Sequence, residues 1–229
     1  MLTCRLNEKD AWIGVGILSL SSSDHAVTIN VGVEGCSAGI NNWPTNEPPS
    51  AIIDGAGQKY LNFGEFNTGV VVTPGSSGTV ATKMTLWSAN DAEPRDPASY
   101  LLFGTNSVIG GTSFDSSLFT LISNGPLSLP ASRNGGGAAA LDPANSFTVN
   151  FANSDAYDTY MVLFPTVKDD SSANSMQVAE IQLFDAADNG LFTPGDSILG
   201  VQSAATIPEA STALLTLLGL GAILGRRRK

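Results

Sequence analysis

The sequence is poor in the residues that carry thiol, zinc and imidazole chemistry. Its 229 residues include two cysteines, Cys4 and Cys36, and one histidine, His25. It contains no Cys-x-x-Cys or Cys/His metal pattern, which excludes most zinc and thiol chemistry, and a Ser-His-Asp triad is implausible with His25 as the only base. If the first segment is removed by processing, Cys36 stands alone and no intrachain disulfide is possible.

Basic residues are also scarce, and they are unevenly distributed. The chain has 11 Lys and Arg against 21 Asp and Glu, and four of the basic residues are the last four, 226–229. Between residues 34 and 196, five basic residues stand against 17 acidic ones, so this body has a net charge near −12. An acidic body repels phosphate backbones, so nucleic-acid binding is not expected. A negative charge of this size is suited to the binding of divalent cations.

The body contains no long segment with the hydrophobic periodicity of an α-helix. With 24 glycines, 12 prolines and 14% charged residues, the composition favours a β-rich fold with many loops. Short apolar or alternating runs, separated by turn residues, predict eight strands at 27–33, 69–73, 81–87, 99–104, 118–123, 146–151, 159–164 and 178–184.

These strands predict an all-β fold, an antiparallel β-sandwich of jelly-roll type that covers residues 27–186. Residues 187–206 are expected to form a linker that holds the body away from a membrane, and 190–201 could add an edge strand to the sandwich.

The last 23 residues combine three features in order. They are a short motif of Ile207, Pro208 and Glu209, an uncharged apolar run at 210–225, and a basic cluster of Arg226, Arg227, Arg228 and Lys229. As a helix, the run would reach roughly 24 Å, slightly less than a ~30 Å hydrocarbon core, and the basic cluster would stay cytoplasmic. A permanent anchor is one alternative; a buried amphipathic helix is another, but the run has no polar face.

Together these parts resemble a PEP-CTERM sorting signal at 207–229, with a transmembrane helix at 210–225. Ala210 stands where the family's motif has its second proline. The resemblance implies an exported protein of a Gram-negative-type bacterium, whose precursor is anchored in the inner membrane by this C-terminal hydrophobic helix. It also implies an exosortase-type enzyme that cuts near Pro208, after which the body reaches the cell surface or the extracellular matrix.

Such a tail requires an export signal at the other end of the chain. Residues 1–26 form a weak signal peptide, because Glu8 and Asp10 interrupt the basic region that precedes the apolar stretch. The alternatives are a misassigned start and a first strand that begins near Trp12.

Three segments of the body resemble, in order, the discoidin-type, galactose-binding-like domains of carbohydrate-binding modules and coagulation factors. They are AIIDGAGQKYLNFG at 51–64, ANDAEPRDPASYLLFG at 89–104 and NSMQVAEIQLF at 174–184. The resemblance covers roughly residues 40–186 and implies a non-catalytic module that binds surface or matrix polysaccharide. A polysaccharide-acting hydrolase with paired carboxylates and a purely structural surface protein remain alternatives, since fold does not fix function.

In that family an Asp side chain, carbonyls of the following turn and a late Glu commonly hold a structural Ca²⁺, an ion that takes six to eight oxygen ligands. By this resemblance, Asp54 matches the side-chain ligand and Gly57 falls in the turn. Ala179 and Glu180 match the late carbonyl and carboxylate. Lys59 stands where the family usually has Thr. Its carbonyl can still bind Ca²⁺, or its ammonium can pair with Asp54 or Glu180 and make a metal unnecessary.

Two further features have more than one interpretation. Trp43, which lies beside Pro44, could stack on a sugar ring or could be a buried tryptophan of the sandwich. The acidic loop at 90–97 could be a second cation site or a ligand loop. Alternatively, Arg95 could fix this loop to a neighbouring carboxylate.

Overall fold

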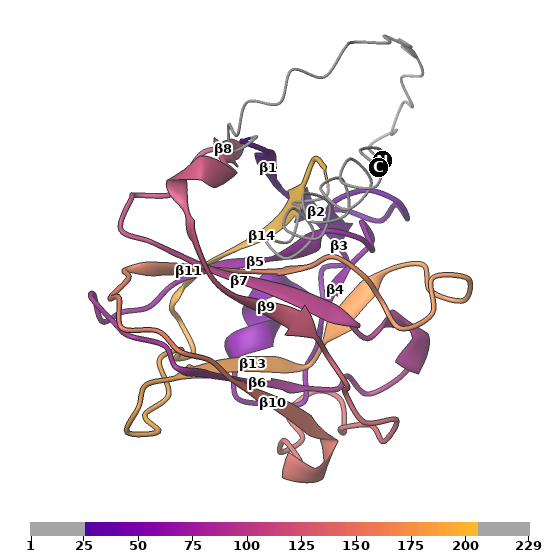
Figure 1. Ribbon diagram of the computed structural model, residues 1–229. Helices are drawn as coiled ribbons and strands as arrows, with labels where there is room; N and C mark the ends of the chain where they lie inside the picture. The colour runs from indigo at the N-terminus through magenta and orange to yellow at the C-terminus, as the bar shows by residue number, and fades with distance from the viewer. Residues whose placement is uncertain (1–25, 206–229) are drawn as a thin grey trace, which may run out of the picture.

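A computed structural model of the chain describes residues 26–205 (Figure 1). The predicted tail at 207–229 lies outside the described residues, as does the expected signal peptide up to residue 25. Within residues 26–205, no helix has the length and apolarity needed to cross a membrane.

The described residues form an all-β sandwich, as the sequence predicts. Seven strands make one antiparallel sheet. In spatial order they are β8 (Ser113–Asp115), β1 (Thr28–Val31), β14 (Ser197–Ser203), β5 (Thr68–Thr73), β11 (Thr159–Phe164), β7 (Ser99–Thr105) and β9 (Thr120–Pro126). The second, three-stranded sheet contains β10 (Ser146–Asn150), β6 (Lys83–Trp87) and β13 (Glu180–Phe184), in that order.

Short elements complete the sandwich. β4 (Tyr60–Asn62) pairs with β12 (Met176–Val178), and β2 (Val33–Glu34) pairs in parallel with β3 (Asn42–Trp43). The connections contain the 3-10 helices η1 (Pro49–Ile53), η2 (Glu93–Arg95), η3 (Ser116–Leu118) and η4 (Pro143–Asn145). All eight predicted strand regions contain strands, β3, β4 and β8 are additional, and β14 overlaps the possible edge strand at 190–201.

The main core lies between the two sheets, with the three-stranded sheet below the seven-stranded one in Figure 1. Alternate residues of β5 and β11, such as Val70, Val72 and Tyr160, are fully buried in it. Met84 and Leu86 of β6 contribute from the opposite layer. Side chains that alternate along a strand point to opposite faces of its sheet, so the remaining residues of β5 and β11 face the other way.

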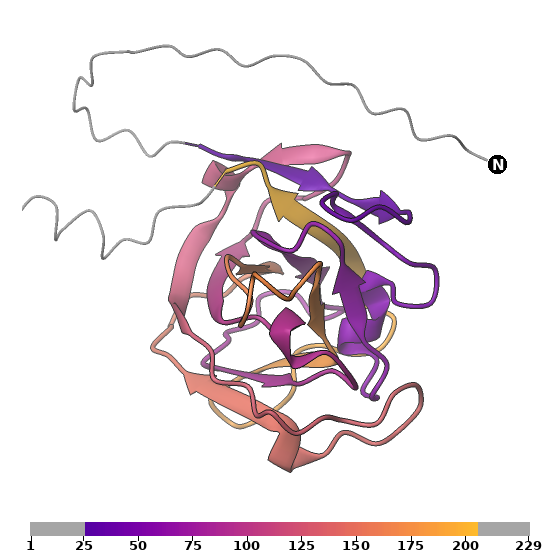
Figure 2. The ribbon, with the colours of Figure 1, turned by 90° about the vertical axis from the view of Figure 1, so that its right-hand side faces the viewer.

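A second apolar cluster lies on that other face of the large sheet. Val71 and Met161 belong to it and are 2% and 0% exposed. Because both faces of β5 and β11 are buried, their sequences are nearly continuous apolar runs rather than alternating ones. Phe119, before β9, belongs to this cluster, Phe114 of β8 packs against it, and the large sheet is curled (Figure 2).

The segment that follows β13 differs from the prediction. The described part of the predicted linker, 187–205, belongs to the sandwich, and the strand within it is not at an edge, because β14 pairs with β1 on one side and with β5 on the other. Phe192 and Val201 are buried in the two apolar clusters, 3% and 0% exposed. This burial ties the segment to the sandwich, which therefore extends from Thr28 to Ser203. Its first and last strands lie side by side at the top of Figure 2.

Candidate functional site

The turn that follows η1 brings together two distant parts of the chain. Gly55 has a φ of 75°, a conformation that favours glycine. Its N–H donates a hydrogen bond to the Oε2 atom of Glu180 over 3.1 Å, although the two residues are 125 positions apart. The Oδ1 atom of Asp54 accepts a hydrogen bond of 2.8 Å from the N–H of Ala56. The sequence prediction that Asp54 and Glu180 meet is consistent with this geometry.

Glu180 is buried at the start of β13, opposite Trp87 of β6, with 4% of its surface exposed. Burial raises the pKa of Glu180 to about 8, and the negative charge of Asp54 contributes to the rise, whereas the hydrogen bond from Gly55 opposes it. Burial also raises the pKa of Asp54. Among the described residues, no Lys or Arg lies within ion-pair distance of either carboxylate. The pair therefore needs a proton or an external cation.

Lys59 does not supply that positive charge. Its side chain extends to the acidic loop, where Nζ lies 2.7 Å from Oδ1 of Asp91 and 3.5 Å from Oε1 of Glu47. Nζ also donates to Oε1 of Gln177 over 3.2 Å. The alternative in which Lys59 neutralises Asp54 or Glu180 is therefore wrong, because these three groups already hold the ammonium.

Gly57 lies under the glycine-rich loop at 133–142. Its N–H donates a hydrogen bond of 2.8 Å to the carbonyl of Ala139. A Cβ atom on residue 57 would lie 1.9 Å from the carbonyl oxygen of Gly135, so any side chain there would displace the loop. Ala179 is fully buried and donates its N–H to the carbonyl of Trp87. The structure thus places Gly57 and Ala179 in the two segments that meet at this turn.

The donor chemistry at the turn fits a hard divalent cation. The buried carboxylate of Glu180 lies beside the partly buried carboxylate of Asp54, and carboxylate oxygens are ligands that Ca²⁺ prefers. Within residues 26–205, no group of three or more His, Cys, Asp or Glu side chains is placed to hold a metal ion. A cation at Asp54 and Glu180 would therefore take its remaining ligands from backbone carbonyls and water.

A carboxyl of raised pKa beside a second carboxylate also resembles the acid of a glycosidase. Such an acid must reach the glycosidic oxygen of its substrate. Glu180 is 4% exposed and faces the Gly55 turn, so the chain of a polysaccharide does not reach it. The geometry favours a structural role for this pair over a catalytic one.

The acidic loop at 90–97 is held by Arg133 and Lys168 rather than by Arg95. Asp96 is fully buried and accepts two hydrogen bonds of 2.8 Å from the guanidinium of Arg133. Nζ of Lys168 lies 3.2 Å from Asp96 and 3.0 Å from Glu93. Arg95 takes no part in these ion pairs. Because internal cations already compensate the loop, a second cation site there is not supported.

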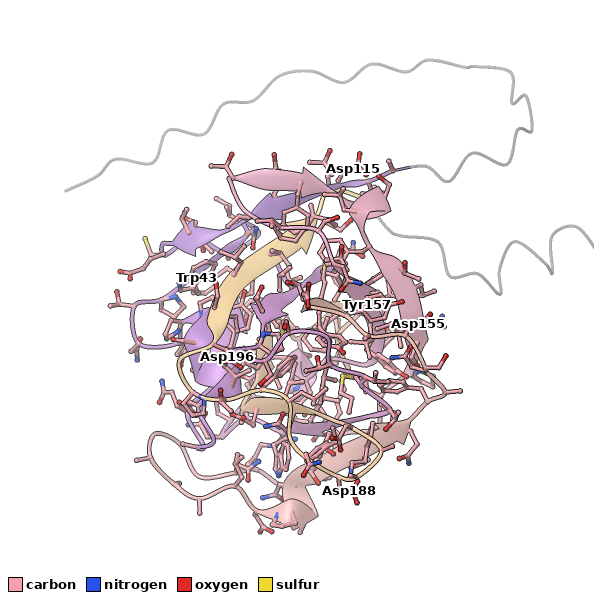
Figure 3. All side chains as sticks on the ribbon, turned by 90° about the vertical axis from the view of Figure 1, so that its left-hand side faces the viewer. Trp43, Asp115, Asp155, Tyr157, Asp188 and Asp196 are labelled. Atoms are coloured by element: carbon pink, nitrogen blue, oxygen red, sulfur yellow. The ribbon has the colours of Figure 1, made fainter. Side chains whose placement is uncertain are left out.

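Trp43 lies on β3, at the edge of the main core. A Cβ atom on Gly200 would lie 2.5 Å from its ring, and the ring meets that of Tyr60 edge-on, with centroids 6.1 Å apart. Trp43 is thus partly buried against β14, as Figure 3 shows from that side. Packing uses part of the ring, which leaves less of it for stacking on a sugar.

Sequence reasoning missed a hollow of about 260 Å³ at one end of the large sheet. Among its lining residues are Thr73, Asn106, Val108, Asp158, Thr159 and Ser197. The sequence signal for this hollow was a Thr or Ser at one end of several apolar strands. A polar residue at such a position is usually interpreted as the start of a loop.

No family model and no curated protein matches the chain. Solved structures with a similar fold include a carbohydrate-binding module, CpGH89CBM32-5 of Clostridium perfringens, in complex with GalNAc-β-1,3-galactose. It is 14% identical, with a TM-score of 0.43 over 70% of this chain and 94% of the module. The family 32 module of C. perfringens NanJ, in complex with galactose, is 10% identical, with a TM-score of 0.43 over 69% and 92%. Chitosan-binding module 1 from a chitosanase/glucanase of Paenibacillus sp. IK-5 is 14% identical, with a TM-score of 0.39 over 71% and 95%. These values describe a distant likeness in architecture and assign no ligand to this chain.

Proposed function

We propose that this protein is an exported, non-catalytic protein of the bacterial envelope or extracellular matrix, whose sandwich binds surface or matrix polysaccharide. The observation that carries the proposal is the meeting of Asp54 and Glu180 at the Gly55 turn. The motifs that resemble discoidin-type domains require these two positions to converge, and simple strand patterning does not. The burial of Glu180 supports a binding role over hydrolysis.

A structural Ca²⁺ is part of the proposal. Asp54 and Glu180 would supply its carboxylates, and the turn that contains Gly57 and Lys59, together with Ala179, would supply carbonyls. The ion would neutralise the buried carboxylate of Glu180 and the partly buried carboxylate of Asp54, which would otherwise repel each other when both are ionised. It would also tie η1 to β13, because the two carboxylates belong to these separate segments.

We further propose that the tail at 207–229 directs export and sorting. The support is its sequence alone: Pro208 and Glu209, the apolar run and the terminal basic cluster occur in order. An exosortase-type enzyme would be the partner, and the mature protein would end near Pro208. The mass of the protein isolated from its native cells tests this, and surface protein that still ends at Lys229 would contradict cleavage.

A glycan array probed with the full-length chain, followed by a turnover assay on every bound glycan, tests the function. Binding without turnover, with and without chelator, is the expected result. Release of shorter sugars would support a hydrolase instead. If no glycan is bound, the purely structural alternative replaces the proposal.

A further inference from the structure

A row of hydroxyl side chains crosses one end of the large sheet. Ser197 is paired with Thr73, Thr73 lies opposite Thr159, and Thr159 is paired with Thr105, so the row spans β14, β5, β11 and β7. By strand alternation, these side chains share the face of Val71, which is the face of the second apolar cluster. The apolar face of the sheet therefore ends in a line of hydroxyl groups.

Part of this line retains unused hydrogen-bonding capacity. The Oγ1 atoms of Thr73 and Thr159 lie 2.9 Å apart, and they share one hydrogen bond, so one of the two hydroxyl hydrogens remains for another acceptor. Ser197 is exposed and makes no side-chain hydrogen bond with the described residues. Thr105 differs, because its hydroxyl already binds the carbonyl of Leu118 and the N–H of Ser107. The free capacity is thus concentrated where the hollow lies.

A carboxylate and an amide stand at the edge of the hollow. Oδ1 of Asp158 accepts a hydrogen bond of 2.8 Å from the N–H of Gly78, and Oδ2 accepts none from the described residues. Asn106 is held in place, since its Nδ2 donates to the carbonyl of Ala156 and its Oδ1 accepts from the N–H of Asp158. This lining is fixed by the backbone and still leaves a carboxylate oxygen to accept hydrogen bonds.

Val108 supplies an apolar wall. It is 99% exposed, at the tip of the loop between β7 and β8, whereas its neighbour Ile109 packs against the second apolar cluster. A sugar ring combines hydroxyl groups with an apolar C–H face, and sites for small ligands combine apolar walls with a few fixed polar groups. The hollow offers both kinds of surface within the reach of one sugar residue.

The charge at this end of the sheet restricts the ligand. Asp155 and Asp196 are close in sequence to the lining residues Asp158 and Ser197, and Figure 3 shows both on one side of the molecule. The basic residues that form ion pairs within residues 26–205 are bound to Glu47, Asp91, Glu93, Asp96 and Asp188, none of which lines the hollow. An anionic sugar would therefore meet carboxylates without a compensating cation.

We propose that this hollow binds an uncharged sugar residue of a polysaccharide. The inference rests on the proposed function and deepens it, because it places the binding site at the ends of β5, β11 and β14 and selects neutral glycans over uronates. Asp158 and the exposed hydroxyls of Thr73 and Ser197 hydrogen-bond the sugar hydroxyls, and the buried Thr159 holds the hydroxyl of Thr73. Val108 contacts the apolar face of the ring.

The test uses the full-length chain in mild detergent, on an array of neutral, amino-sugar and uronate oligosaccharides. The double substitution Thr73→Val and Thr159→Val removes both members of the hydroxyl pair while keeping their shape, so little loss of stability is expected. On the neutral glycan bound best by the wild type, we expect about tenfold weaker binding for this variant and a severalfold loss for Val108→Ser.

The chain offers a matched control. Thr85 and Thr148 form a second threonine pair, also 2.9 Å apart, on the three-stranded sheet. Their double substitution to Val should leave glycan binding unchanged. If the Thr73/Thr159 and Val108 variants bind as the wild type does, or if uronates are bound best, the hollow is not the site, while the proposed function stands. If the wild type binds no glycan on the array, the proposed function fails and this inference fails with it.

Discussion

Two buried carboxylates in this sandwich are compensated in different ways. Asp96 is fully buried and is held by Arg133 and Lys168. Glu180 is 4% exposed, lies beside Asp54 and receives an N–H from Gly55, but no cation of the described residues reaches it. In a chain with few basic residues, the cations gather at one acidic loop and leave the second site unpaired. The contribution of Asp96 to stability should therefore depend on basic residues of the chain, and that of Glu180 on protons or cations from the solution.

The largest expected effect comes from breaking the Asp96 site. Arg133→Ala leaves a fully buried carboxylate with Lys168 as its remaining partner, so we expect a loss of about 3 kcal/mol in the free energy of unfolding. Denaturant unfolding of the full-length chain measures it. Arg95→Ala is the matched control, because Arg95 lies on the same loop without an ion pair to Asp96. Equal losses for the two variants would contradict the assignment of Arg133.

The Glu180 site should respond to calcium instead. An ion that binds only the folded state stabilises it by about 2.7 kcal/mol at a hundredfold excess over Kd. For a sandwich of this size, that corresponds to a rise of roughly 5–10 °C in Tm. Thermal unfolding in calcium and in chelator measures the shift for the wild type, Asp54→Asn and Glu180→Gln.

Both variants should lose the calcium response, and Arg133→Ala should keep it. Identical melting of the wild type in the two buffers would show that no calcium site exists. A shift that survives both substitutions would place the ion elsewhere on the chain.

The fold could be predicted largely from the sequence, because buried strands leave apolar runs. The runs of β5 and β11 are nearly continuous apolar segments, since both faces of the large sheet are covered. The sequence did not predict β14 as an internal strand. Its segment resembles a linker, because it contains Gly195, Gly200 and several polar residues. Its position depends on pairing with β1, whose residues are 170 to 174 positions away, and no local pattern encodes such a pairing.

Only part of the candidate site could be predicted from the sequence. Asp54 and Glu180 stand within motifs, so their meeting could be expected. The partner of Lys59 could not, because the choice between Glu180 and Asp91 depends on the direction in which one long side chain leaves the turn. Likewise, Arg133 lies in a glycine-rich loop, and nothing in its sequence indicates that it reaches Asp96.

The raised pKa of Glu180, from its ordinary value of 4.5 to about 8, gives a pH test of the same contrast. Between these pH values the folded state holds a proton that the unfolded state has lost, so stability decreases as the pH rises through this window. In chelator, we expect a loss of about 1 kcal/mol between pH 7 and 8.5. Denaturant unfolding at each pH measures it.

Glu180→Gln should remove this loss, and saturating calcium should remove it too, because the bound ion keeps Glu180 ionised. An unchanged slope in Glu180→Gln would assign the titration to another group.

The smallest effect should come from an ion pair at the surface. Lys83 pairs with Asp188, whose side chain is 76% exposed, and its Nζ lies 4.2 Å from the centre of the Phe184 ring. Lys83→Met keeps the apolar stem and removes the charge, so we expect a loss below about 1 kcal/mol. That loss should shrink further in 1 M salt, where exposed charges are screened within about 3 Å, whereas the loss from Arg133→Ala should persist. Denaturant unfolding at low and high salt measures both variants. If Lys83→Met costs as much as Arg133→Ala, the burial of Asp96 is not what makes its ion pairs more stabilising than the exposed pair of Lys83 and Asp188.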